Sequence, residues 1–281
     1  MQLPGRGVTL AGLAVLSFSF SFPATAWALQ GFGPWSTTGL RGALAAVLAG
    51  VALVISRAEL PARSDWPALA TVAIGCVIGF PLLTALALQT SSTAHSAVVI
   101  GALPMATAVV AALRTGRHPS RRFWAAAGLG AVVVVGFALE QSHGRPSLAD
   151  VYLVLGLVLY AEGGRLAAHL PGWKVIAWGV VLAAPVSLAV CGFALTHEPV
   201  HLTGRAVGGL AYLAAVSQLG GFVIWYRGMG LIGVARASQL QLAQPLLTLV
   251  WAVLLMGETL SVTVPIAAVA VLACIVVTQR S

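Results

Sequence analysis

Charged residues are scarce in this sequence. Only 8% of its 281 residues are Asp, Glu, Lys or Arg, whereas a soluble globular chain carries roughly 25%. Hydrophobic residues make up 59% of the chain, and its mean hydropathy is +0.97. A surface of this composition could not be wetted, which excludes a soluble enzyme and a disordered chain. The remaining class is a membrane protein with several spanning helices.

Several functional motifs are absent as well. The sequence contains no asparagine, and therefore no N-glycosylation sequon. Its three cysteines, Cys76, Cys191 and Cys274, lie in separate apolar runs, which suits packing residues better than a metal site or a disulfide framework. There is no P-loop, no H-E-x-x-H and no G-x-S-x-G motif. We therefore expect neither an enzyme nor a bound metal or cofactor.

Long apolar runs fill most of the chain. A spanning helix needs about 20 mostly apolar residues, and this criterion predicts an all-α membrane protein with ten transmembrane helices. Their ranges are 8–29, 33–56, 66–88, 93–113, 122–140, 149–168, 174–195, 206–226, 235–256 and 261–279. The first run also resembles a signal peptide that ends at the cleavage-like triplet 24–26. We favour an uncleaved span, because cleavage would break the repeat described below.

The basic residues are distributed unevenly between the two sides of these spans. With the N-terminus inside, twelve of the fifteen fall on the inner side and only Arg145 and Arg205 fall outside, while Arg41 lies within the second span. The positive-inside rule then predicts a multi-pass protein of the plasma (inner) membrane with both termini in the cytoplasm. The net charge of +8 is thus a signal of topology, and we expect a lipid bilayer around the chain and no nucleic acid partner.

The two halves of the chain resemble each other. Moving residue 94 onto residue 235 aligns them without gaps, and Pro104 then falls on Pro245, Thr107 on Thr248 and 116 on 257. This offset predicts two five-helix repeats, 1–145 and 146–281. Because five is odd, the second repeat must be inverted in the membrane. Inverted repeats are the architecture of many secondary transporters, which bind substrate between the halves.

The sequence resembles EamA-type permeases of the drug/metabolite transporter superfamily. The residues that carry the resemblance are the segments 244–248 and 256–260 and the closing apolar span, together with Leu40-Arg41. In the first half Arg117 stands where the family often has Glu. The resemblance implies ten helices and the export, or sometimes import, of small metabolites without ATP. It says almost nothing about the substrate.

Polar residues within the ninth span form the first candidate site. Gln241, Gln244, Pro245 and Thr248 fall at i, i+3, i+4 and i+7, which is one face of a helix. Because polar groups are costly in a membrane, they mark a candidate path for a polar substrate. The alternative is that they hydrogen-bond neighbouring helices as packing contacts. On the eighth span Gln218 and Trp225 share a face in the same way, and Trp225 is either an aromatic wall of a site or part of an interfacial belt.

Four further residues complete the candidate substrate site and its coupling. Ser21 in the first span either lines a cavity or belongs to a small-residue packing face. His95 and Arg41 lie near the outer ends of the fourth and second spans, where they either act on substrate or are solvated or packed. Glu162 is the candidate for proton coupling; its alternative is a structural ion pair with Arg165.

We therefore interpret the chain as a secondary transporter of a small organic metabolite, with a site drawn from spans one, four, six, eight and nine. The rival interpretations are a non-transporting scaffold or receptor and an intramembrane enzyme that acts on lipid. The segment 228–233 matches G-x-G-x-x-G, but a dinucleotide site requires a preceding strand, which an apolar span does not provide.

Overall fold

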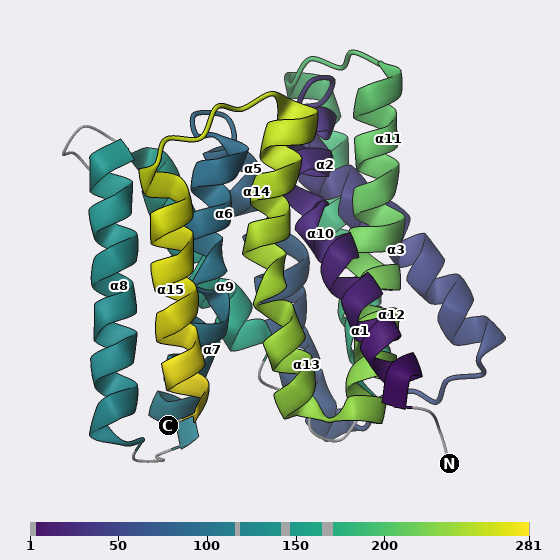
Figure 1. Cartoon of the computed structure of the whole chain (residues 1–281). Coiled ribbons are helices and arrows are strands. Elements are labelled where there is room, and N and C mark those ends of the chain that lie inside the picture. Colours follow the sequence, from purple (N-terminus) through teal and green to yellow (C-terminus); the bar gives the residue numbers. More distant parts are fainter. Residues whose placement is uncertain (1–3, 116–118, 142–146, 165–170, 281) are drawn as a thin grey trace.

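The protein is a bundle of helices (Figure 1). The computed structural model describes residues 4–115, 119–141, 147–164 and 171–280, and within these ranges it contains helices and no strand. In chain order the elements are α1 (Pro4–Ser19), α2 (Ser21–Ala28), α3 (Pro34–Ile55), η1 (Arg63–Asp65), α4 (Trp66–Val72), η2 (Ala73–Gly79), α5 (Phe80–Ala87), α6 (Thr93–Gly101), α7 (Leu103–Thr115), α8 (Arg121–Gln141), α9 (Leu148–Gly164), α10 (Gly172–His197), α11 (Gly204–Tyr212), η3 (Leu213–Gly220), α12 (Gly221–Ile232), α13 (Val234–Gln241), α14 (Ala243–Met256) and α15 (Thr263–Arg280).

Helices occupy each range for which the sequence predicts a span, although the end of the range 149–168 lies outside the described residues. Eight helical stretches of the described chain are long and apolar enough to cross a membrane. Two shorter apolar helices, Leu148–Tyr160 and Thr263–Thr278, occupy the sixth and tenth ranges. Large apolar side chains are exposed on the outer faces of the bundle, among them Val132 (68%) and Leu254 (67%). A surface of this kind requires lipid around it, so the chain is a multi-pass membrane protein.

Prolines interrupt several of the long stretches. The helices α1 and α2 meet at Phe20, just before Pro23, and the breaks between α6 and α7 and between α13 and α14 lie just before Pro104 and Pro245. Proline has no N–H to donate, and its ring clashes with the carbonyl of the residue four positions earlier. The regular hydrogen bonding of the α-helix is therefore interrupted at these points. The segments η2 and η3 are π-helical, and such wider turns often lie at functional sites.

The interruptions recur in both halves of the chain. At the offset that moves residue 94 onto 235, the break between α6 and α7 falls within one residue of the break between α13 and α14. At the same offset η2 coincides with η3. The two halves therefore bend their helices at corresponding points, and the start of α1 and the end of α15 lie at the same end of the bundle (Figure 1).

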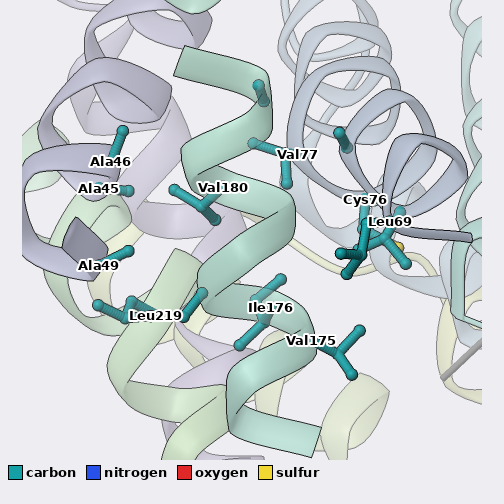
Figure 2. Close-up of a cluster of buried hydrophobic side chains, with 14 of the residues drawn as sticks. Ala45, Ala46, Ala49, Leu69, Cys76, Val77, Val175, Ile176, Val180 and Leu219 are labelled. Atoms are coloured by element: carbon teal, nitrogen blue, oxygen red, sulfur yellow. The ribbon is translucent and has the colours of Figure 1, made fainter. Parts of the chain in front are cut away.

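Close pairs of helices hold the bundle together. The helix α3 packs along α10, α1 along α12, α2 along α11, and α8 along α15. Between α3, α10 and η2 lies a core of small and β-branched side chains that includes Ala45, Ala49, Val77 and Val180 (Figure 2). Within lipid the hydrophobic effect does not drive helices together. Small residues favour their association because they allow close contact between the backbones.

Candidate functional site

A cavity lies among the helices in the interior of the protein. Its lining comes from both halves of the chain and comprises Phe18, Ser21, Phe22, Thr25, Arg41, Cys76, Phe80, Thr84, Ile100, Leu103, Tyr160, Ser217, Phe222, Gln241 and Gln244. The space open to the centres of water-sized molecules is about 70 Å³. A single water needs roughly 10–15 Å³ on this measure, so the cavity has room for several waters or for a small organic solute.

Arg41 on α3 is the cation of this cavity. Its side chain is buried, with 8% of the residue exposed. Its Nε donates to Oε1 of Gln218 over 2.8 Å, and one Nη donates to Oγ of Ser217 over 3.2 Å. The Ser217 hydroxyl also shares a hydrogen bond of 2.8 Å with the Ser21 hydroxyl. Among the described residues no carboxylate forms an ion pair with Arg41, and the atoms of this part of the chain that accept its hydrogen bonds are neutral oxygens.

The π-helical segment η3 supplies both acceptors for Arg41. Ser217 and Gln218 are neighbours on this segment, and both are buried. In a regular α-helix neighbouring side chains point about 100° apart, since one turn takes 3.6 residues. In η3 these two neighbouring side chains nevertheless both accept hydrogen bonds from the guanidinium group of Arg41.

Gln241 and Gln244 line the cavity from α13 and α14, on either side of the break before Pro245. The same two glutamines, with Pro245 and Thr248, also line a smaller adjoining cavity of about 20 Å³. All four residues of the predicted stripe therefore share a face. The Thr248 hydroxyl is engaged in packing, because it donates to the carbonyl oxygens of Ser19 (2.9 Å) and Gln244 (3.0 Å).

Comparison with known proteins identifies the family. The model of the EamA-like transporter family matches the chain twice, over residues 5–139 and 151–279. The chain belongs to the EamA-like transporter family. It is 42% identical over 272 residues to the uncharacterized transporter YdeK of Bacillus subtilis (strain 168), and this alignment covers 95% of each protein. A solved crystal structure with 19% sequence identity superposes with a TM-score of 0.68 over 97% of both chains, which shows the shared fold.

The EamA-like motif at residues 256–260 has a structural role here. Gly257 adopts a left-handed conformation (φ 67°) and ends α14, as glycine commonly does at a helix C-terminus. The carboxylate of Glu258 then accepts hydrogen bonds from the backbone N–H groups of Thr93 (2.7 Å) and Ala94 (2.9 Å) at the start of α6. These N–H groups have no partner within α6, and the positive end of the helix dipole favours a carboxylate there.

A second carboxylate of the EamA-like chain makes the same contact elsewhere. Glu198, which follows α10, accepts from the backbone N–H groups of Trp35 (3.2 Å) and Ser36 (2.7 Å) at the start of α3. In both cases a carboxylate from the second half caps a helix of the first half. These caps hold together the two halves that form the cavity.

The structure brings Arg41, Ser21, Gln241 and Gln244 together in the cavity, and Gln218 joins them through Arg41. It places two other predicted site residues elsewhere.

The first of these is His95, whose Nε2 lies 2.7 Å from Oδ1 of Asp150. Its ring stacks on Phe137 at 5.3 Å between centroids. The second is Trp225, which is buried against Ala11 and Val15 of α1. Neither residue is part of the cavity lining. The backbone of Glu162 belongs to α9, but its side chain, like Arg165, lies outside the described residues.

Several cavity residues were not predicted from the sequence. Tyr160 on α9 and Ser217 on η3 add polar groups, and the phenylalanines on α1, α2, α5 and α12 replace Trp225 as the aromatic lining. Ser217 could have been found beside Gln218. In a sequence this rich in apolar residues, nothing distinguishes a phenylalanine that faces a cavity from one that faces lipid.

The glycine-rich segment 228–233 has a packing role. Its residues up to Ile232 are still part of α12. The link between the eighth and ninth spans is therefore shorter than the sequence predicts. A Cβ atom at Gly228 would lie 2.6 Å from the backbone nitrogen of Ala11. The glycine therefore allows α12 to approach α1, and the segment has no preceding strand that a dinucleotide site would need.

Proposed function

We propose that this EamA-like protein is a secondary transporter of small organic metabolites, such as amino acids or related compounds, across the plasma membrane, and that it acts as an exporter. The observation that carries the proposal is the interior cavity, to which both halves contribute polar side chains. Buried polar and charged groups within a membrane protein are costly and mark substrate paths. Arg41, Ser21, Gln218, Gln241 and Gln244 are the proposed binding residues, with Thr248 beside them.

We further propose that the chain crosses the membrane ten times, as two inverted repeats over 1–145 and 146–281, with both termini in the cytoplasm. Three observations support this arrangement. The family model matches twice, helix breaks and π-helical segments recur at one offset, and α1 begins at the end of the bundle where α15 finishes (Figure 1). Alternating access would then arise from movement of one repeat against the other around the cavity.

Glu162 remains the candidate for proton coupling, by virtue of its place on α9, the helix that also supplies Tyr160 to the cavity. A carboxylate within a spanning helix is a common proton carrier in transporters. Glu162→Gln should abolish the dependence of transport on a proton gradient while binding persists.

Flux through purified protein tests the proposal. The protein is reconstituted into liposomes loaded with a mixture of small metabolites, and release is followed by mass spectrometry of the external medium. Protein-free liposomes of the same lipid provide the control. We expect selective release of a subset of the solutes. Equal retention of all solutes in both preparations would contradict transport.

Reporter fusions test the topology separately. A reporter that is active only in the cytoplasm, fused in turn to each terminus, should be active at both ends. Activity at one end alone would exclude an even number of spans.

A further inference from the structure

Where corresponding positions of the two halves both line the cavity, their side chains differ in polarity. At the offset that moves residue 94 onto 235, Ile100 corresponds to Gln241 and Leu103 to Gln244, and all four line the cavity. The pairs are therefore apolar in the first half and amide-bearing in the second. The two sets of residues occupy corresponding positions of the repeat. The cavity is therefore lined by amide side chains on one side and by apolar side chains at the matching positions.

A third corresponding pair of lining residues shows the same difference. Ser217 stands at the position that corresponds to Cys76, and Phe80 lies beside Cys76 on the apolar side.

The first half also contributes the polar side chains of Ser21, Thr25, Arg41 and Thr84. Of these, Arg41 hydrogen-bonds to Ser217 and Gln218 of the second half, and Ser21 hydrogen-bonds to Ser217. Arg41, Gln218, Ser217 and Ser21 thus form one hydrogen-bonded group, and Gln241 and Gln244 line the same cavity. The apolar lining residues of the first half include Phe80, Ile100 and Leu103.

We propose that the solute bound in this cavity is a small organic anion with an apolar group. Its carboxylate binds Arg41 beside Gln241 and Gln244, and its apolar group contacts Phe80, Ile100 and Leu103. This inference deepens the proposed function and rests on it for the role of the cavity in transport.

The anionic group follows from the surroundings of Arg41. Within the part of the chain that the structure describes, the buried guanidinium group of Arg41 has only neutral acceptors. Such a group loses most of the stabilisation that water would provide. A carboxylate restores it, because two parallel N–H···O bonds match the geometry of the guanidinium fork. The weakest of the present contacts, the 3.2 Å bond to Ser217, is the one that an incoming carboxylate replaces.

The apolar group follows from the other lining residues. Ile100, Leu103 and Phe80 offer no hydrogen-bonding side-chain groups, so a solute that is polar throughout would lose hydration there without compensation. An aliphatic or aromatic group gains free energy from the same contact, in proportion to the apolar area that leaves water. Binding sites of this composition take ligands with one polar end and one apolar end.

Matched acids and amides test the anionic group. Butanoate, 3-methylbutanoate and phenylacetate, each beside its primary amide, are titrated into the purified full-length protein at constant ionic strength. The midpoint of thermal unfolding reports binding. We expect each acid to bind about tenfold or more tightly than its amide, as for loss of one charge-assisted hydrogen bond. Equal binding of acid and amide, or no stabilisation by any of the six compounds, would overturn the inference.

Substitution of Arg41 separates recognition from a structural role. Arg41→Gln should reduce the preference for acid over amide to about one, and Arg41→Lys should retain part of it. A purely structural role would lower stability in both variants and leave the preference unchanged. If Arg41→Gln does not fold, the comparison of acids with amides in the wild-type protein still tests whether the cavity binds an anion.

Exchange of the corresponding residues tests the apolar group. Ile100→Gln together with Leu103→Gln should remove the advantage of 3-methylbutanoate over acetate, whereas Gln241→Ile together with Gln244→Leu should keep it. An unchanged advantage in the first double variant would contradict the assigned contacts.

Transport is measured on the same preparations, so that two failures can be told apart. Flux of other solutes with equal binding of acids and amides would leave the transporter standing and overturn the anion. Selective binding of the acids without flux of any solute would support the anionic ligand and contradict transport.

Discussion

Arg41 on α3 donates its Nε hydrogen to Oε1 of Gln218 on η3, and 2.8 Å separates the two atoms. Both residues are buried, with 8% and 1% exposed. The bond joins a helix of the first half to a π-helical segment of the second half. It therefore links the charge in the cavity to the packing between the two halves.

Removal of the acceptor tests this link. Gln218→Leu leaves the buried guanidinium group without its Nε partner, and we expect the free energy of unfolding to fall by about 1–3 kcal/mol. Thermal unfolding in detergent measures the change. In the Arg41→Met background, Gln218→Leu should lower the free energy of unfolding much less, because the guanidinium group that needs the acceptor is absent. Additive losses in the double variant would show that the two side chains do not interact.

A glycine on α3 provides a second prediction. A Cβ atom at Gly39 would lie 2.6 Å from the backbone nitrogen and 2.8 Å from the Cα of Cys191 on α10. Backbone atoms cannot yield as a flexible side chain can, so Gly39→Ala should separate the two helices and lower stability by about 1–3 kcal/mol. The shift should also weaken solute binding, because Arg41 lies on the same turn of α3.

Gly50 is the matched control on the same helix. A Cβ atom there meets nothing within 4 Å. Gly50→Ala should therefore be neutral or raise stability by about 0.5–1 kcal/mol, the usual gain when alanine replaces glycine within a helix. Equal destabilisation by both alanines would show that α3 and α10 are not packed as described.

The cap on α6 provides a third prediction. Glu258→Ala removes the acceptor for the N–H groups of Thr93 and Ala94, and we expect a loss of about 0.5–2 kcal/mol. Glu258→Gln should lose less, since one oxygen remains as an acceptor. Glu140 is the control: it is exposed, and its carboxylate accepts from the neighbouring Gln141. If Glu140→Ala destabilised the protein as much as Glu258→Ala, the cap would not be the cause.

Much of the fold could be predicted from the sequence, because a spanning helix leaves a long local signal. The stripe formed by Gln241, Gln244 and Thr248 was visible for the same reason, since these positions share a helical face. Arg41 stood out as a charge inside an apolar run. The resemblance to EamA-type permeases is confirmed by the match of the family model to both halves.

Contacts between distant helices could not be predicted in this way. Glu258 caps a helix that begins 165 residues earlier in the chain, and a single sequence does not say which helix ends meet. For His95 the sequence left open whether it acts on substrate or is solvated or packed, because its partner, Asp150, belongs to another helix. The π-helical segment η3, which carries Ser217 and Gln218, has no signature in composition or periodicity.

The most direct test of the central claim, transport through the cavity, is solute flux in proteoliposomes that contain the double variant Gln241→Leu, Gln244→Leu. The control is Leu254→Ala on α14, the helix that carries Gln244, at a side chain that is 67% exposed on the outer face. We expect flux to fall about tenfold or more in the double variant, the effect of losing roughly 1.4 kcal/mol of hydrogen bonding. Flux in the control should match the wild type. Wild-type flux through the folded double variant would contradict the claim.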